Sequence, residues 1–398
     1  MRSILSVLWC CVIGAAHAAS EPFTPADDSV VLERQAAPKQ TIAGLRALRE
    51  QQRRLAQNPD DLEQAAAFAR AAITLGRAEA DPRYFGYAES ALRPWIAPAM
   101  PPPVARLLRA TLRQQRHDFA GALGDLDALI AAGPSNAQAR LTRATVLMVQ
   151  GRPEEALRDC AALFGRTSVL SAATCIAGAR SLDGHAEAAR ATLDAALVNA
   201  TDAGAEEKIW ALTAAAEMAQ RRGDAAPAEA NFRAALATLE RADARDPYLL
   251  TAWADFLLEH DRAAEVLPLL ADFTRVDNAL LRLTLAEDAL ANPAAAGHVR
   301  LLQARFDETR QRGDTVHLRE ETLFELRLRH DAARAVELGL QNWQSQREPA
   351  DARLLLQAAI AAKKPDAAQP VLDWMTRTHI EDPALQALAA QLPTGAAR

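Results

Sequence analysis

The sequence predicts an all-α protein made of stacked antiparallel helical hairpins, and three observations support this fold class. Aromatic residues are only 5% of the chain while hydrophobic residues are 50%, which suits closely packed helices better than strands rich in Val, Tyr and Phe. No segment alternates apolar and polar residues as a half-buried strand would. A helical pattern also recurs about every 34 residues. The chain has 398 residues, more than a single hydrophobic core usually contains, and stacked repeats remove that limit because each repeat packs only on its neighbours.

The repeat is defined by an alanine, once a valine, in the middle of a helix, followed four residues later by a hydrophobic residue, with a Gly or His turn shortly upstream. These anchor residues are Ala88, Ala122, Ala156, Ala189, Ala228, Val266, Ala335 and Ala368. The successive intervals are 34, 34, 33, 39, 38, 69 and 33 residues. Because 69 is about twice the period, we expect a divergent repeat between Val266 and Ala335, with its second helix near residues 295–312.

The clearest unit spans residues 137–164, with a turn at residues 151–153 between its two helices. Each helix has one strongly apolar side, because hydrophobic residues follow one another at intervals of one, three and four. Alanine at the anchor has a mechanical reason: a methyl group lets the two helices of a hairpin approach closely, where a larger side chain would push them apart.

Five Asx-Pro pairs precede predicted helices, since Asn or Asp caps a helix and proline is tolerated at its first position. They are Asn58-Pro59, Asp81-Pro82, Asp246-Pro247, Asn292-Pro293 and Asp382-Pro383. With the repeats, these signals predict an N-terminal helix over residues 40–57 and an array of about nine hairpins over residues 58–380. Residues 381–398 are expected to form a capping helix and tail, and residues 19–39 a disordered lead.

The first 18 residues have the features of a secretory signal peptide. Arg2 precedes an apolar run from Ile4 to Ala16, and Ala16-His17-Ala18 is a small-x-small cleavage site. The run is shorter than the roughly 20 residues that a membrane-spanning helix needs. We therefore expect cleavage near Ala18 and a soluble mature protein in a bacterial periplasm.

Small, alanine and bulky positions recur in the same order in four units, and the first of these units also has the proline position. The matching residues are Ala110, Ala122, Leu126 and Pro134 in one unit, Ala144, Ala156 and Cys160 in the next, Ala177, Ala189 and Leu193 in a third, and Ala216, Ala228 and Phe232 in a fourth. This pattern resembles the tetratricopeptide repeat family. The aromatic and Leu-Gly positions of the first helix are mostly replaced, and Gly339 stands where that family has a bulky residue.

The resemblance implies a right-handed superhelical solenoid whose concave face is lined by the first helix of each hairpin and binds a peptide or protein segment. Matching positions place these residues on that face: Trp210, Thr213, Glu217, Gln220, Tyr248, Thr251, Asp255, Glu259, Arg353 and Gln357. Trp210 and Tyr248 are candidate anchors, because amphipathic rings dominate many interfaces, although they could instead pack against neighbouring hairpins. Glu217, Asp255 and Glu259 would favour a partner carrying Arg or Lys.

Two cysteines, Cys160 and Cys175, remain after removal of the expected signal peptide. They lie on antiparallel neighbouring helices of adjacent units, and an exported protein meets an oxidising environment. Two interpretations stay open. The cysteines form a disulfide, or both are small apolar residues packed between helices as free thiols.

Charge and motifs limit the function classes. The net charge of -6 and the lack of a Lys/Arg cluster argue against nucleic acid as the ligand. We find no G-x-S-x-G elbow, phosphate loop, H-E-x-x-H or C-x-x-C, so the sequence predicts no enzyme, no cofactor and no metal site. We expect an interaction scaffold or adaptor with an unidentified protein or peptide partner. The alternative is a module associated with polysaccharide or peptidoglycan binding or export.

Overall fold

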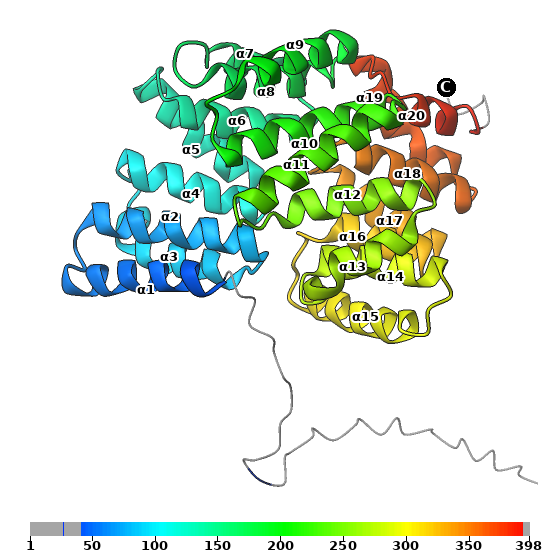
Figure 1. The fold of residues 1–398 in the computed structure, drawn as a ribbon, viewed down its shortest axis with the longest axis horizontal. Coiled ribbons are helices and arrows are strands. Elements are labelled where there is room, and N and C mark those ends of the chain that lie inside the picture. Colours follow the sequence, from blue (N-terminus) through cyan, green and yellow to red (C-terminus); the bar gives the residue numbers. More distant parts are fainter. Residues whose placement is uncertain (1–26, 28–40, 393–398) are drawn as a thin grey trace, which may run out of the picture. The chain divides into compact units, whose positions relative to one another are not determined.

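The structure, a computed structural model, describes residues 41–392 together with Asp27, except for the side chains of residues 41–43. Within these residues it contains twenty α-helices and two short 3-10 helices and no β-strand, which confirms the all-α class (Figure 1). All the helices belong to one compact unit that begins at Gln40. The expected signal peptide, the lead over residues 19–39 and the end of the tail lie outside the described residues.

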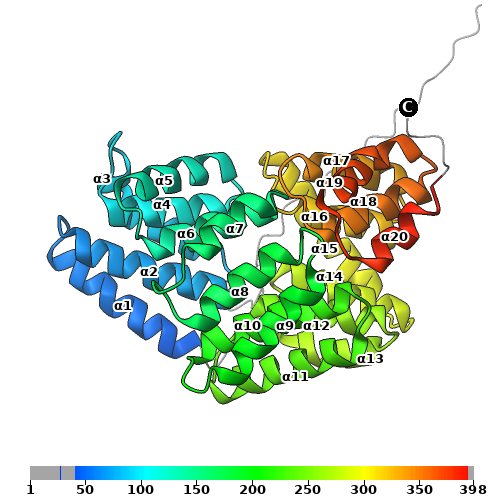
Figure 2. The same ribbon diagram turned by 90° about the horizontal axis from the view of Figure 1, so that it is seen from above.

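The helices pair into consecutive hairpins, and Figures 1 and 2 follow them by colour along the chain. The N-terminal helix α1 (Thr41–Gln57) packs against α2, and α20 (Pro383–Ala389) packs against α18 at the other end. The nine hairpins are α2 (Leu62–Glu79) with α3 (Arg83–Ile96), α4 (Pro103–Gln115) with α5 (Phe119–Ala132), α6 (Ala137–Val149) with α7 (Pro153–Ala161), α8 (Val169–Arg180) with α9 (Ala186–Asn199), α10 (Ala205–Arg221) with α11 (Ala225–Arg241), α12 (Pro247–Glu259) with α13 (Ala263–Leu270) and the short η1 (Ala271–Phe273), α14 (Asp277–Ala289) with α15 (Ala295–Gln311), α16 (Leu318–Arg327) with α17 (Ala332–Trp343), and α18 (Pro349–Ala361) with η2 (Pro365–Ala368) and α19 (Gln369–Thr378).

The anchor residues form the core of each hairpin. All eight are at most 3% exposed, so the methyl-sized positions inferred from the sequence lie between packed helices. In the divergent repeat the second helix is α15, where Leu302 and Phe306 are 0% and 1% exposed at the anchor position and one turn later. A leucine therefore stands where most other hairpins have alanine.

Capping explains several of the helix starts. Asp246 and Asp382 accept the backbone N–H of Leu249 and Leu385 at 3.1 and 3.0 Å, and each is followed by proline at the first helical position. The predictions for Asn58-Pro59, Asp81-Pro82 and Asn292-Pro293 are wrong, because in each case the helix begins after the proline. Helix α2 begins at Leu62, because Asp61 is its cap and accepts the N–H groups of the next turn.

Two glycine turns allow the early hairpins to touch the last ones. Gly151 has a φ of +67°, and a Cβ added there would lie 2.9 Å from the Cβ of Arg347. Beside it, the backbone N–H of Arg347 donates to the carbonyl oxygen of Val149 at 2.7 Å. Gly184 has a φ of +79°, and a Cβ there would lie 3.0 Å from the carbonyl oxygen of His379. Glycine is thus needed both for the turn and for the close approach of hairpins distant in sequence.

We expect Ala156→Leu to lower the free energy of unfolding by about 1–3 kcal/mol, because Ala156 is fully buried and three added carbon atoms overpack the hairpin. Urea denaturation of the purified protein measures this change. The control is Ala161→Leu, an exposed position on the same helix, where the effect should stay within about 0.5 kcal/mol. Equal effects at the two positions would contradict the close approach at the anchor.

Candidate functional site

The candidate site is a polar surface formed by the first helices of several hairpins. We define the first-helix face as the accessible residues Glu217, Gln220, Tyr248, Asp255, Glu259, Arg353 and Gln357, which come from α10, α12 and α18. Seven of the ten residues expected on the concave wall therefore remain accessible. Their side chains are held by contacts that cross from one helix to another.

Three of these residues form a chain of hydrogen bonds between three helices. The Nε2 group of Gln220 donates to Glu259 at 2.7 Å, and the Nη1 group of Arg353 donates to the other oxygen of Glu259 at 2.6 Å. Glu259 and Arg353 are 94 positions apart in sequence. On its far side the guanidinium of Arg353 lies 3.6 Å from the buried carboxylate of Asp382. The tertiary fold thus joins α12 to α18 through a carboxylate and an arginine.

Tyr248 is the large aromatic residue of this face. Its side chain is 62% exposed, and its hydroxyl donates to the carboxylate of Glu217 at 2.5 Å. Removal from water raises the pKa of Glu217, and the hydrogen bond from Tyr248 offsets only part of that effect. The nearby charge of Glu217 in turn raises the pKa of Tyr248 well above its ordinary value. The pair presents an open ring beside a carboxylate.

The other acidic residues of this face are already paired with arginines. Asp255 accepts two hydrogen bonds from Arg282 of α14, both of 2.9 Å, and Arg282 is 8% exposed. Burial lowers the pKa of the Arg282 guanidinium, but the charge of Asp255 and its hydrogen bonds outweigh it, so the pKa is raised overall. Since Glu259 pairs with Arg353, the stretch expected to be acidic is largely neutralised. Among the acidic residues named for this face, Glu217 has no arginine within ion-pair distance in the described part of the chain.

Three of the expected residues are left out of the first-helix face, because two are buried and the third packs on an apolar cluster. Thr213 and Thr251 are 4% and 8% exposed, and their hydroxyls donate to the carbonyl oxygens of Ile209 and Pro247 one turn earlier. Trp210 is half-buried against the apolar cluster that contains both cysteines. The two threonines are thus bonded within their own helices, and Trp210 packs on residues of α6, α7 and α8.

Arg319 forms a separate group of ion pairs between first helices, which the sequence analysis did not identify. Its guanidinium donates to Asp351 at 2.5 and 2.8 Å and also contacts Glu348, so it joins α16 to the start of α18. The pKa of Arg319 is raised well above its ordinary value, since those carboxylates outweigh the effect of burial. No local sequence pattern predicts the ion pairs of Arg319, because its partners lie 29 and 32 positions away in the next hairpin.

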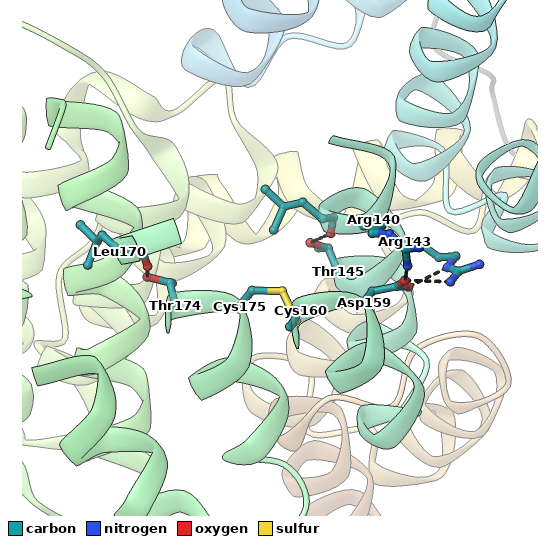
Figure 3. The surroundings of a disulfide bond; sticks show 9 residues. Arg140, Arg143, Thr145, Asp159, Cys160, Leu170, Thr174 and Cys175 are labelled. Atoms are coloured by element: carbon teal, nitrogen blue, oxygen red, sulfur yellow. Dashed lines mark hydrogen bonds and ion pairs between the residues drawn. A yellow bond between two sulfur atoms is a disulfide. The ribbon is translucent and has the colours of Figure 1, made fainter. Parts of the chain in front are cut away.

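Two buried aspartates each hold a pair of arginines, a motif that the sequence analysis also missed. Asp159, which is 0% exposed, accepts hydrogen bonds from Arg140 and Arg143 (Figure 3). Asp125 is held in the same way by Arg109 and Arg113 in the preceding hairpin. Arg109 and Arg143 are 34 positions apart, and so are Asp125 and Asp159. The recurrence of an arginine and an aspartate at the repeat period could therefore have predicted these ion pairs.

The structure contains a disulfide between Cys160 of α7 and Cys175 of α8 (Figure 3). Both cysteines are 0% exposed, and the S–S distance is 2.01 Å. The bond therefore joins the second helix of one hairpin to the first helix of the next, one residue from Asp159. Trp210 packs on the same cluster, which links this region to α10.

The described residues show two further absences. Among residues 41–392, no helix is long and apolar enough to cross a membrane. The same part of the chain has no group of three or more His, Cys, Asp or Glu side chains arranged to hold a metal ion.

Comparisons with known proteins find similarity to solved structures at low sequence identity. No family model and no curated protein matches it. Three solved structures, each 15% identical, are similar: a tetratricopeptide repeat protein from Parabacteroides merdae (73% of this chain, 98% of that chain, TM-score 0.37), a Rap protein complexed with competence and sporulation factor (88%, 98%, 0.46), and the TPR domain of P58(IPK) (88%, 97%, 0.21). The description of the fold as an array of stacked helical hairpins rests on the chain's own helices and buried anchors.

Replacing Asp159 tests the buried charge cluster. Asp159→Ala should lower the free energy of unfolding by about 3–5 kcal/mol, because it leaves two largely buried arginines without their carboxylate. Chemical denaturation measures this loss. Asp127→Ala is the matched control: Asp127 pairs with the same Arg143 but is 62% exposed, so its loss should stay below about 1 kcal/mol. Similar losses of unfolding free energy in the two variants would show that burial of Asp159 does not strengthen its ion pairs with Arg140 and Arg143.

Reduction tests the disulfide. In the chain from residue 19 onward, thiol titration of the unfolded protein without reductant should find no free thiol. Reductant should lower the free energy of unfolding by roughly 3 kcal/mol, since the bond closes a loop with a sequence separation of 15 residues. The double variant Cys160→Ala, Cys175→Ala should be insensitive to reductant. Two free thiols in the unreduced protein would overturn the bond.

Proposed function

We propose that this chain is an exported interaction scaffold or adaptor that binds a peptide or protein segment on its first-helix face and carries out no chemistry of its own. The observation that carries the proposal is Tyr248, a 62% exposed aromatic residue on a surface of polar, cross-bridged side chains. Amphipathic rings contribute much of the binding energy in many interfaces, because they bury a large area and lose little side-chain entropy.

The Tyr248 and Glu217 pair suits a basic side chain of a partner. A guanidinium or ammonium group over the tyrosine ring gains about 0.5–1 kcal/mol at an exposed site. The same group would pair with Glu217, which has no arginine within ion-pair distance among the described residues. The cost of removing the Glu217 carboxylate from water is then compensated by an opposite charge.

The arginine-paired carboxylates around this pair have a different role in the proposal. Asp255 and Glu259 are held by Arg282 and Arg353, so a partner would have to displace an existing ion pair to use them. These pairs frame the binding surface and set its shape. Specificity therefore depends on Glu217 beside Tyr248. An Arg or Lys of the partner segment can pair with Glu217 without displacing a cation that already contacts it.

Export to a bacterial periplasm is part of this proposal. It is supported by the apolar run from Ile4 to Ala16 and the small residues at the expected cleavage site, Ala16 and Ala18. A buried disulfide between Cys160 and Cys175 fits an oxidising compartment. The mature chain purified from its native envelope should then begin next to Ala18.

Capture of the partner tests the surface. The tagged mature chain is used to enrich proteins from the native envelope, and mass spectrometry identifies what is retained. Tyr248→Ala and Glu217→Lys should each reduce the enrichment of the specific partner at least about tenfold, the loss expected for a residue at the centre of an interface. Asp255 is left unchanged, because its removal would strand the buried Arg282.

Two matched controls separate binding from folding. Tyr87→Ala removes another exposed tyrosine, 52% exposed on α3, and Glu240→Lys reverses an exposed charge on α11. Both controls should retain the partner, and all four variants should keep the helical circular dichroism and melting temperature of the parent. Enrichment that is unchanged in Tyr248→Ala and Glu217→Lys would refute the proposed surface.

A further inference from the structure

Three hairpins from the first half of the array touch one end of the last hairpin. They are α6 with α7, α8 with α9, and α10 with α11, and each makes this contact through the turn between its two helices. The other side of the contact is the chain just before α18 and just after α19. We define the clasp by the residues of the three turns and of the facing segments: Gly151, Gly184 and Arg222 on one side, and Arg347, His379 and Glu381 on the other.

The clasp is a close backbone contact at two of its three points. The backbone N–H of Arg347 donates to the carbonyl oxygen of Val149 at 2.7 Å, next to the turn at Gly151. At Gly184 the carbonyl oxygen of His379 lies where it would be 3.0 Å from an added Cβ. These contacts leave no room for a side chain in either turn.

The third point of the clasp is an ion pair. The Nη1 group of Arg222 donates to the carboxylate of Glu381 at 3.2 Å, across 159 positions of sequence. The same carboxylate accepts the backbone N–H of Glu187 at 3.3 Å. The side chains of Arg222 and Glu381 are 23% and 38% exposed, so water and salt reach this pair.

Little apolar packing supports the clasp. Within residues 41–392, no helix from α6 to α11 packs along a helix from α16 to α20. The apolar cluster of the last hairpin includes Trp343 and Trp374, and the early hairpins contribute only Met148 and Leu182 to it. Separation of the clasp therefore breaks no hairpin and unwinds no helix. Contacts of this kind open at a lower free energy than the unfolding of the whole chain.

The clasp is continuous with the first-helix face. Glu381 of the clasp precedes Asp382, whose buried carboxylate lies 3.6 Å from the guanidinium of Arg353. Arg353 of α18 also donates to Glu259 of α12 at 2.6 Å. Since the clasp holds the end of the last hairpin where α18 begins, its separation draws Arg353 away from Glu259.

We propose that the clasp is a conformational switch that opens as one unit while every hairpin stays folded, and that its opening separates α18 from α12 on the first-helix face. A ligand shifts such an equilibrium only if it binds one state more tightly than the other. A partner segment that contacts both α12 and α18 finds them together only in the closed state, so the clasp regulates its binding. This consequence rests on the proposed function, whereas the opening itself does not.

Amide hydrogen exchange tests the opening in the chain from residue 19 onward, without any partner. The N–H of Arg347 is the reporter, because its acceptor lies on the other side of the clasp. Fragmentation after exchange gives the rate at this one residue. We expect the protection factor of Arg347 to be at least about tenfold lower than that of Leu356 inside α18, because the clasp opens before the helix does.

Two glycine variants test whether the clasp opens as one unit. Gly184→Ala puts a methyl group against the carbonyl oxygen of His379 and should speed the exchange of Arg347 at least about fivefold. Gly223→Ala is the matched control, since its φ of +81° is close to the +79° of Gly184 and nothing lies within 4 Å of the added Cβ. It should leave the rate unchanged. Gly184 and Arg347 belong to different points of the clasp, so only a joint opening connects them.

Charge reversal tests the third point in the same way. Arg222→Glu replaces the attraction to Glu381 by a repulsion and should speed the exchange of Arg347 about threefold to tenfold. The double variant Arg222→Glu, Glu381→Arg should restore the slow exchange. Arg312→Glu is the control, because Arg312 also caps the end of a helix and pairs with a glutamate, Glu308, but lies outside the clasp.

A change on the first-helix face tests its connection to the clasp. Glu259→Gln removes the ion pair that joins α12 to Arg353, so it should also speed the exchange of Arg347. Glu240→Gln, at an exposed position of α11, should not. All variants should keep the helical circular dichroism of the parent.

Three results would overturn the proposal. If Arg347 exchanges as slowly as Leu356, the clasp does not open separately from the helices. If Gly184→Ala and Arg222→Glu leave the exchange of Arg347 unchanged, the three points do not open together. If Glu259→Gln leaves it unchanged, the clasp and the first-helix face are independent. Failure of partner capture would leave these measurements standing and would remove only the consequence for the partner.

Discussion

The close approach of two helices at a buried, mostly methyl-sized anchor is the constraint on which the rest of this structure depends. Each hairpin buries its anchor to 3% exposure or less, and the residue four positions later fills the remaining space in most hairpins. A hairpin cannot cover its apolar side alone, so it must stack on its neighbours, and stability is shared along the array. The site residues are positioned by this stacking, because successive first helices bring their polar sides together.

Charge is organised differently inside the hairpins and across them. Within a hairpin, Asp125 and Asp159 each gather two arginines from the partner helix, and the arrangement repeats with the period of the array. Across hairpins, Glu259 pairs with Arg353 and Asp255 pairs with Arg282. The sequence separations of these two pairs do not follow the repeat period. The first kind belongs to the repeat. The ion pairs across hairpins depend on how the hairpins of this chain stack. They leave Glu217, beside Tyr248, without an arginine partner among the described residues.

The divergent repeat shows what happens when the regular packing relaxes. At α15 the anchor is Leu302, the junction with α16 is wide, and the space is bridged by Phe306 and Phe324. Phe306 and Phe324 are 1% and 0% exposed, so large rings fill the core where the two backbones stand apart. The period of the sequence marked this region as irregular, since one interval is twice the others. The period could not show how far apart α15 and α16 lie, because the distance between two helices depends on all the side chains between them.

The sequence by itself determined the fold class, the eight buried anchors and the candidate first helices, because helix periodicity and repeat spacing are local properties that survive without knowledge of the partners. It also named seven residues that stay accessible on the first-helix face. Only the tertiary structure decided that Thr213 and Thr251 are buried, that Asp255 and Glu259 are neutralised, and that Arg319 joins α16 to α18. The reason is physical: small rotations between repeats accumulate, so contacts between distant hairpins follow from the whole stack and not from any one segment.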